Sequence, residues 1–351
     1  MGKYTSIGGQ ALIEGIMMKS PEKTALSVRL PDGSIDTEML DHKSLRQKYK
    51  FLNIPVIRGV IGFAESMVQG YKAMMLSAEK SGFTDLEEET DKKENATEET
   101  AEETAEQVQE KSEKKDSTLV NIVMIVGVVL GVALSIVLFM LIPRLVVSGI
   151  EWLVKTELPK LARSFIEQFL KLSVFVLYVW LVSRMKDIKR VFMYHGAEHK
   201  TIFCYEKGLE LTVENVREQR RFHPRCGTSF MILMILISVI LSTVVQIIFP
   251  QVYNLTWIWV GIKILLIPLT CGIGFEVLKV CGRFDNTITR IISAPGLWLQ
   301  RITTVEPEDD MIEIAITALK ACEPEVPDVD RSGCCCDDSK QEDIQKSDEE
   351  E

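Results

Sequence analysis

The sequence predicts a mainly α-helical, multi-pass membrane bundle of about four spans, with a small N-terminal α+β segment. Two long runs carry no charge, 24 residues from Leu119 to Ile142 and 20 residues from Phe230 to Phe249. A helix that crosses the hydrocarbon core of a membrane needs about 20 apolar residues, so both runs are predicted spans. Ahead of them, residues 1–84 alternate β-prone runs with turn residues, a pattern typical of a small soluble segment.

The N-terminal segment is predicted to be a cytoplasmic α+β unit. It opens with IGGQALIEGIMMKSP, an apolar pattern interrupted by glycines. The run TALSVRL-PDG-SIDTEML then places Pro-Asp-Gly between two β-prone stretches, which predicts a hairpin. Apolar residues next recur at helical spacing through IRGVIGFAESMVQGYKAMMLSAEKSG. An amphipathic helix is therefore expected after the hairpin.

Two further spans complete the predicted bundle. Trp257–Phe275 contains a single charged residue, Lys263. Phe165–Ser183 contains Glu167 and Lys171 near its start, followed by eleven uncharged residues. Both stretches are therefore expected to cross the membrane, in addition to the two uncharged runs.

Two segments of the chain are strongly acidic. Residues 85–116 and 323–351 each carry a net charge of −9, so the rest of the chain carries +8 although the whole carries −10. Segments with so little apolar content cannot offset the entropy of ordering, so we expect a disordered linker and a disordered tail. Between bundle and tail, residues 285–322 are expected to hold an interfacial PGLWLQR stretch and a short amphipathic helix, Asp309–Ala321.

The distribution of Lys and Arg predicts the orientation of the membrane domain, residues 117–284. The loop at 184–229 holds ten Lys and Arg residues, whereas Pro250–Thr256 holds none. Positive loops stay in the cytoplasm. The sequence therefore predicts a protein of the cell membrane with both termini and this loop in the cytoplasm, where cysteines are poor disulfide candidates.

The cytoplasmic loop opens with a histidine motif. His195-Gly-Ala-Glu198-His199 has the form H-x-x-E-H, the inverted zincin signature in which two His bind zinc and the Glu activates water. Residues four apart share a face of a helix, so both imidazoles can reach one cation. The pattern fixes only three positions, and a polar helix end after a span would look the same.

A second half-motif strengthens the metal hypothesis. In RRFHPRCGTSF, His223 and Cys226 lie three apart on a predicted turn. Three of the four histidines of the chain thus share one loop with Cys226 and Cys204. Zinc accepts this mixture of imidazole and thiolate, as do other divalent transition metals. The alternative is that the cysteines are small buried hydrophobes and the histidines are surface residues.

The sequence allows more than one set of direct metal ligands. The candidate ligands are His195, His199, His223, Cys226 and Cys204. Four protein ligands would make a structural site, whereas three ligands and a water would make a catalytic one with Glu198 as general base. Cys204 would need a bend in the helix, because five positions correspond to a rotation of about 140°. Glu276 is a further possible ligand, although pairing with Lys279 is the favoured interpretation.

Membrane lipids are the predicted surroundings and partners. An arginine cluster beside the candidate site suits an anionic lipid or a phosphorylated substrate. It consists of Arg217, Arg220, Arg221 and Arg225. No aromatic residues alternate with these arginines, so no specific nucleic acid is predicted. Charge that merely sets the topology is an equally good interpretation.

Four long motifs carry a family resemblance. They read GGQALIEGIMMKSP, YHGAEHKTIFCYEKGLELTVENVR, RFHPRCGTSF and PGLWLQRITTVEP. Together they resemble the YqhQ-like family of uncharacterised bacterial membrane proteins, described as predicted metal-dependent enzymes. The resemblance covers residues 1–84 and about 165–321. It implies a multi-pass inner-membrane protein and supplies no substrate and no catalytic residue.

The leading hypothesis is a membrane-embedded, zinc-dependent hydrolase with its site on the cytoplasmic face and Glu198 activating a water. A second hypothesis is a membrane scaffold or assembly factor in which a structural metal clamps the loop. A third is a transporter component, motivated by Lys263 and Pro268 in the last span. The lack of a visible inverted repeat makes the third weaker than the others.

Overall fold

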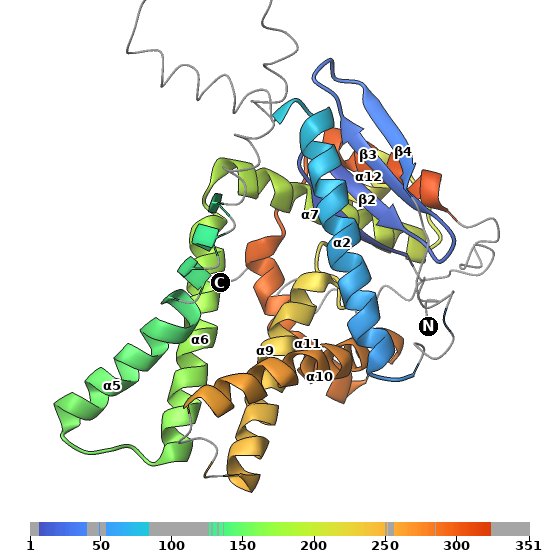
Figure 1. The fold of residues 1–351 in the computed structure, drawn as a ribbon. Coiled ribbons are helices and arrows are strands. Elements are labelled where there is room, and N and C mark those ends of the chain that lie inside the picture. Colours follow the sequence, from blue (N-terminus) through green and yellow to red (C-terminus); the bar gives the residue numbers. More distant parts are fainter. Residues whose placement is uncertain are drawn as a thin grey trace, which may run out of the picture. The chain divides into compact units, whose positions relative to one another are not determined.

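A computed structural model gives the fold of the chain. It describes residues 7–40, 49, 54–83, 126–127, 129–131, 133–135, 137–249, 251, 256–284 and 286–323. The predicted linker at 85–116 and the tail beyond residue 323 lie outside these described residues. The described part is mainly helical, with one small sheet near the N-terminus (Figure 1).

The strands all precede the helices in the chain. The strands are β1 (Gly8–Leu12), β2 (Gly15–Lys19), β3 (Thr24–Arg29) and β4 (Ile35–Leu40). The helices are α2 (Ile57–Lys80), the π-helical turn η2 (Val137–Leu141), α5 (Ile142–Val154), α6 (Lys160–Val182), α7 (Lys186–Glu206), α8 (Val213–Arg217), α9 (Gly227–Ile248), α10 (Thr256–Arg283), α11 (Thr287–Thr303) and α12 (Asp309–Cys322). The amphipathic helices predicted after the hairpin and near the C-terminus are confirmed as α2 and α12.

The sheet is a four-stranded antiparallel meander in the order β1-β2-β3-β4. The predicted hairpin is confirmed as β3 and β4, with Arg29 opposite Ile35. Gly33 adopts φ +86° in the connecting turn, a conformation that glycine reaches without a Cβ penalty. The turn between β1 and β2 is tighter, because Leu12 pairs with Gly15 and only two residues lie between them.

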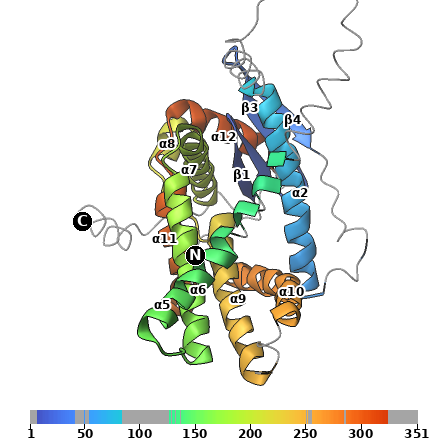
Figure 2. The same cartoon turned by 60° about the vertical axis from the view of Figure 1, so that its left-hand side comes forward.

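Helices cover both faces of this sheet. Successive residues of a strand point to opposite faces, and β2 follows this rule. Ile16 and Met18 pack into the cluster formed with α7 and α12, whereas Met17 packs into the cluster on the α2 side. Figures 1 and 2 show α2 on one face and α7 with α12 on the other. The sheet therefore forms a rigid layer behind α7, the helix that carries the histidine motif.

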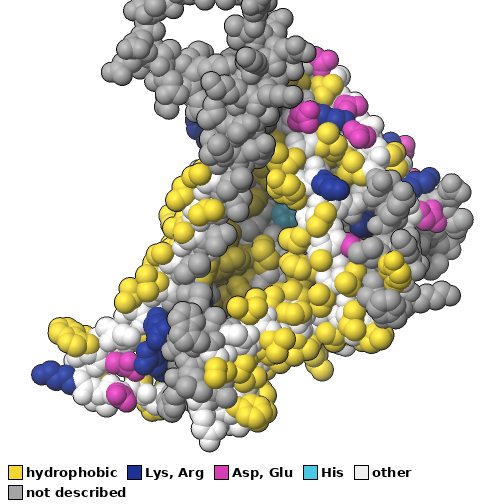
Figure 3. All heavy atoms as spheres, viewed as in Figure 1, with side chains coloured by type: hydrophobic (Ala, Val, Ile, Leu, Met, Phe, Trp, Pro, Cys, Tyr) yellow, Lys and Arg dark blue, Asp and Glu magenta, His cyan; other side chains and the backbone are white. Residues whose placement is uncertain are grey.

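Four described helices are long and apolar enough to cross a membrane. They are Val129–Val154, Ala162–Val182, Gly227–Ile248 and Gly261–Cys281. The number agrees with the sequence-based expectation. The first span ends at Val154 rather than at the predicted Ile142, because Pro143 is accommodated in the first turn of α5 and the helix continues past it. Exposed hydrophobic side chains cover much of the visible surface of these helices (Figure 3).

The chain divides into two compact units. One contains residues 1–84, 183–234 and 268–351, and the other contains residues 85–182 and 235–267. The first unit holds the sheet, α2, α7, α11 and α12, together with one end each of α9 and α10. The second unit holds α5, α6 and the remaining parts of α9 and α10. The histidine motif thus belongs entirely to the first unit.

Candidate metal centre

The histidine motif lies in the middle of α7, and this helix is continuous from Lys186 to Glu206. Asp187 lies in the first turn, where its negative charge interacts favourably with the positive N-terminal end of the helix. Gly196 lowers helix propensity but is required by packing. A Cβ at this position would overlap the backbone oxygen of Val305. The glycine therefore lets the segment after α11 approach α7 next to His195.

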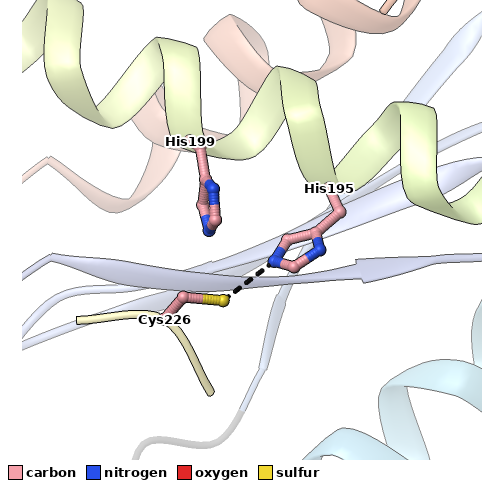
Figure 4. A group of neighbouring side chains, drawn as sticks. All are labelled: His195, His199 and Cys226. Carbon is pink, nitrogen blue, oxygen red and sulfur yellow. Dashed lines mark hydrogen bonds between the residues drawn. The ribbon is translucent and has the colours of Figure 1, made fainter. Parts of the chain in front are cut away.

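Three side chains of the first unit converge on one point (Figure 4). His195 and His199 project from the same face of α7 toward Cys226, which lies just before α9. The two ring centroids are 4.4 Å apart, and His195 Nε2 lies 3.0 Å from Cys226 Sγ. One ligand atom from each of the three residues lies within 4.8 Å of both others. This is the group of described residues that could hold a metal ion.

Backbone carbonyls orient both imidazoles. His195 Nδ1 lies 2.8 Å from the Thr303 oxygen, and His199 Nδ1 contacts the Arg221 oxygen. A carbonyl only accepts, so each Nδ1 carries a proton, and each Nε2 presents a lone pair when its imidazole is neutral. His199 Nε2 is buried and has no hydrogen-bond partner in the structure. Metal-binding histidines are held in this way, with the distal nitrogen fixed by a hydrogen bond.

The position of Cys226 depends on Gln300 of α11, which is fully buried. The His223 N–H donates to Gln300 Oε1 at 2.7 Å, and Gln300 Nε2 donates to the His223 oxygen at 2.7 Å. Gln300 Nε2 also donates to Ser229 Oγ at 2.8 Å. One amide therefore holds the backbone before Cys226 and a side chain after it. A buried amide paired this completely is a rigid support for the thiol.

Glu198 lies next to the three converging side chains and is 5 % exposed. It accepts a hydrogen bond from the backbone N–H of Gly9 in β1. A Cβ at Gly9 would lie 2.9 Å from the carboxylate carbon of Glu198. The first strand of the sheet thus forms the wall against which the carboxylate rests, and this wall has no room for a side chain.

The pKa values of the converging side chains and of Glu198 are set by burial and by the charges of these groups on one another. Burial raises the pKa of Glu198, an effect that His199 and His195 oppose. Burial alone would raise the pKa of the Cys226 thiol, but His195 and His199 bring it well below its usual value. Burial alone would lower the pKa of His195, but Cys226 and Glu198 raise it to about 9. The free site therefore favours a thiolate beside an imidazolium.

His223 and Cys204 lie outside the converging group. The His223 ring centroid is 5.6 Å from that of His199. Its Nδ1 accepts the Arg225 N–H at 3.3 Å, and its Nε2 lies 3.7 Å from Glu206. Burial is the main reason that the pKa of His223 is lowered. Cys204 packs in the hydrophobic core between α7, α12 and the sheet, since α7 lacks the bend that would turn it toward the histidines.

Glu276 and the arginines make other contacts. Glu276 accepts two hydrogen bonds from Arg58, at 2.6 and 2.5 Å, so it pairs with α2 rather than with Lys279. Three arginines of the predicted anion cluster pair with carboxylates of the same unit. The pairs are Arg217 with Asp309, Arg221 with Glu306 and Arg225 with Glu206. These carboxylates neutralise much of the charge that favoured an anionic ligand there.

Sequence reasoning missed the supporting residues. Gly9 and Thr303 contact the histidine motif from more than a hundred positions away in the chain, and Gln300 contacts His223 from 77 positions away. The glycine pair in the opening motif was a visible signal that a backbone approach was needed at Gly9. Gln300 and the carbonyl of Thr303 gave no comparable signal, because any sequence supplies carbonyls and α11 has no distinctive pattern around Gln300.

The residues present fit a metal ion. Ligands that share one zinc at about 2.0–2.3 Å lie about 3.3–3.8 Å from each other in a tetrahedral site. The observed limit of 4.8 Å exceeds this by about 1 Å, which small side-chain rotations can close. The unpartnered Nε2 of His199 supplies a buried lone pair that a cation would satisfy. The group could thus hold zinc or another divalent transition metal.

Comparisons with known proteins agree with this description. Residues 54–325 match the model of a family described as "Protein of unknown function (DUF1385)". The chain is 35 % identical over 310 residues to "Uncharacterized protein YqhQ" of Bacillus subtilis (strain 168), covering 88 % of this chain and 89 % of that protein. No solved structure matches the chain.

Proposed function

The chain belongs to the DUF1385 family, and we propose that this protein is a membrane-bound, metal-dependent hydrolase. The metal, zinc or another divalent transition metal, is held by His195, His199 and Cys226. The observation that carries the proposal is the convergence of these three buried side chains beside a fourth, Glu198. Three protein ligands leave one position for a water or substrate, which is typical of catalytic zinc sites.

Glu198 is the general base of this proposal. A zinc ion bound by the three ligands would supply a water whose pKa lies near 7. The Glu198 carboxylate, which lies beside the ligands and accepts the Gly9 N–H, would accept the proton from that water. Its raised pKa brings it closer to the operating pH, where a general base is most effective. The wall formed by β1 excludes bulk water from the carboxylate on that side.

The proposal is tested by the metal content and product formation of the purified full-length protein. We expect about one transition-metal ion per chain by inductively coupled plasma mass spectrometry. The substrate is first sought by comparing membrane extracts incubated with and without the enzyme. Glu198→Gln should then keep the metal, while turnover of that substrate falls about 10²–10⁴-fold. Glu206→Gln, the same change at a partly buried position of the same helix, is the matched control and should retain turnover.

The opposite results separate the alternatives. A protein without stoichiometric metal contradicts the metal centre. Metal retained with full turnover in Glu198→Gln contradicts the role of the base. A third result would favour the scaffold, in which the metal is a structural clamp. The first unit would unfold when the metal is removed, and no extract would show turnover. A structural site would also need a fourth protein ligand, and the three-residue group provides none among the described residues.

A second candidate is covalent catalysis by Cys226. Its Sγ lies 3.0 Å from His195 Nε2, and Thr303 orients the same imidazole through Nδ1. A nucleophile, a base and an orienting group in this order are the arrangement of thiol-dependent acyl transfer. Chelation separates the two functions. A metal hydrolase loses turnover with a chelator and regains it with zinc, whereas a cysteine enzyme keeps turnover with the chelator and loses it with iodoacetamide.

The cytoplasmic placement of the site remains part of the proposal. It is supported by the ten Lys and Arg residues at 184–229. Alkaline phosphatase fused after residue 157 should be active outside the cytoplasm, whereas a fusion after residue 208 should be inactive. Activity in the reverse pattern would place the candidate metal centre on the other face of the membrane.

A further inference from the structure

Helix α11 has two faces of different character, and the hydrolase proposal uses only one of them. The inner face is buried and includes Gln300 and Thr303, which support the metal centre. The outer face carries Ile288, Ile291 and Trp298, and each of these side chains is more than half exposed. Residues three, four or seven positions apart share one side of a helix. The three large hydrophobic side chains therefore form one exposed stripe along α11.

An exposed stripe of this kind needs a partner. Single hydrophobic residues on a surface are ordinary, whereas a row of them marks a site of contact with a protein or a membrane. The sequence predicted an interfacial stretch here, PGLWLQR. The structure adds that the tryptophan of this stretch, Trp298, lies on the exposed side of the helix, opposite the buried Gln300.

The middle of α11 lies beside the ends of two candidate spans. A Cβ on Gly296 would lie 2.5 Å from the Cβ of Ser229, and Ser229 is the third residue of the candidate span Gly227–Ile248. Gly296 also lines a small pocket together with Cys281, the last residue of the candidate span Gly261–Cys281. All of these contacts fall within the first unit. They place α11 at the level where the hydrocarbon core meets the lipid headgroups.

The charge of α11 favours a lipid surface over a protein as the occupant of its outer face. The helix contains two arginines, Arg290 and Arg301, and no acidic residue. Both arginines belong to exposed positions, one near each end of the hydrophobic stripe. A helix with apolar side chains, a tryptophan and flanking cations is typical of one that lies in a membrane interface. Its cations are then attracted to anionic headgroups.

We propose that the outer face of α11 binds the surface of the membrane beside the ends of α9 and α10. Ile288, Ile291 and Trp298 enter the boundary between the headgroups and the acyl chains. Arg290 and Arg301 lie at the level of the headgroups and favour anionic lipids there. The metal centre would then lie on the opposite side of α11, about one helix diameter, or about 10 Å, from the lipid. The binding surface itself does not depend on the metal or on the hydrolase proposal.

The test is photocrosslinking of the full-length protein in nanodiscs made of equal parts of dioleoyl phosphatidylcholine and dioleoyl phosphatidylglycerol. The photoreactive residue p-benzoylphenylalanine replaces Ile291 or Trp298 in turn. Both variants should form adducts with lipid, detected by mass spectrometry of the intact protein. Met39 on the edge strand β4 is the matched control, because it is an exposed hydrophobic residue of the same unit. The same replacement of Met39 should give no lipid adduct.

The composition of the adducts tests the role of the two arginines. Phosphatidylglycerol should exceed phosphatidylcholine about fivefold among the adducts at Ile291, the enrichment expected from one cation near an anionic surface. The change Arg290→Gln/Arg301→Gln in the same labelled protein should abolish this excess. An excess that persists in the double variant, or no excess in the first place, overturns the assignment of the arginines.

The remaining outcomes decide the surface itself. Crosslinks from Ile291 and Trp298 to a second copy of the chain would make this face a dimer interface and overturn the proposal, as would equal lipid labelling at Met39. The native fluorescence of Trp298 provides a second measurement without a bulky label. In nanodiscs of phosphatidylcholine brominated on its acyl chains, the wild type and Trp298→Phe should retain the same emission, because Trp298 is quenched. Greater emission from the wild type would show that Trp298 lies away from the lipid, and would also overturn the proposal.

Discussion

The two polar clusters of the molecule differ in how completely their polar atoms are paired. In the metal centre, backbone carbonyls occupy the Nδ1 atoms of both imidazoles, and His199 Nε2 is buried without a hydrogen-bond partner. In the second unit, Arg163 pairs with the carboxylates of Glu151 and Glu167 and forms what we call the Arg163 network. Because buried polar groups are paired in native proteins, the metal centre is the cluster suited to bind a further group.

The difference teaches how each unit positions its polar atoms. In the first unit, the sheet and α11 hold the metal centre through main-chain atoms and the amide of Gln300. In the second unit, the Arg163 network is held by side chains alone, which come from α5 and α6. The metal centre should therefore be sensitive to small changes in packing, whereas the Arg163 network should tolerate changes that preserve its charges.

The largest effect should follow the loss of a metal ligand. His199→Ala removes the lone pair that lies buried without a partner, and the metal affinity should fall by more than about a hundredfold, beyond the range for loss of an outer partner. His223→Ala is the matched control. Its ring contacts Arg225 and Glu206, so the affinity should change by less than about tenfold. Competition with a chromophoric chelator measures both.

A large loss of affinity in both variants would contradict this assignment. His223 would then be a ligand, as the sequence alone allowed, and the site would have four protein ligands. The comparison of the two clusters would change as well, because a closed structural site needs no open position. Retention of metal by His199→Ala would remove the metal centre from the comparison altogether.

Local patterns explain which parts of the fold were predictable. The Pro-Asp-Gly hairpin, the four spans and the two amphipathic helices follow from residue spacing and composition, and the structure confirms them. The end of the first span was displaced because α5 continues past Pro143 and Arg144, so a charge near a span did not mark its boundary.

The candidate site was predictable only in part. His195 and His199 share a helix face, which spacing alone indicates, and the turn after His223 brings Cys226 close. Nothing in the sequence could decide whether the imidazole or the thiol of that turn would converge with His195 and His199. That choice depends on Gln300, 77 positions away, and such tertiary contacts leave no local pattern.

The next effect concerns the close packing of the metal centre. Gly196→Ala places a methyl group against the Val305 oxygen, and overpacking of this kind costs about 1–3 kcal/mol. The segment that supplies the Thr303 carbonyl must shift, so thermal stability and metal affinity should fall together. Gly149→Ala on α5 is the matched control. A Cβ there meets no atom within 4 Å, so this variant should be at least as stable as the wild type.

An unchanged Gly196→Ala protein would show that the segment after α11 is mobile enough to accommodate the methyl group. The metal centre would then not be the rigid member of the two clusters. Differential scanning fluorimetry in detergent, with and without added zinc, measures the change. Loss of stability only in the absence of zinc would indicate that the metal itself holds the segment in place.

The pH dependence of metal binding should be smaller but specific in sign. The free His195 has a pKa of about 9, so below that pH it must release a proton before its Nε2 can bind a metal. The Cys226 thiol, whose pKa lies well below its usual value, is already a thiolate. Zinc affinity should thus rise about tenfold per pH unit between roughly 7 and 9, with about one proton released per ion.

Isothermal titration calorimetry in buffers of different ionisation enthalpy counts the released protons. Two protons at pH 7 would mean that Cys226 is a thiol in the free protein, contrary to its contact with His195. Release of no proton, together with a zinc affinity that does not change with pH, would mean that His195 is neutral at pH 7 in the free protein. In either case the free metal centre would lack the thiolate–imidazolium pair that its mixed charges favour.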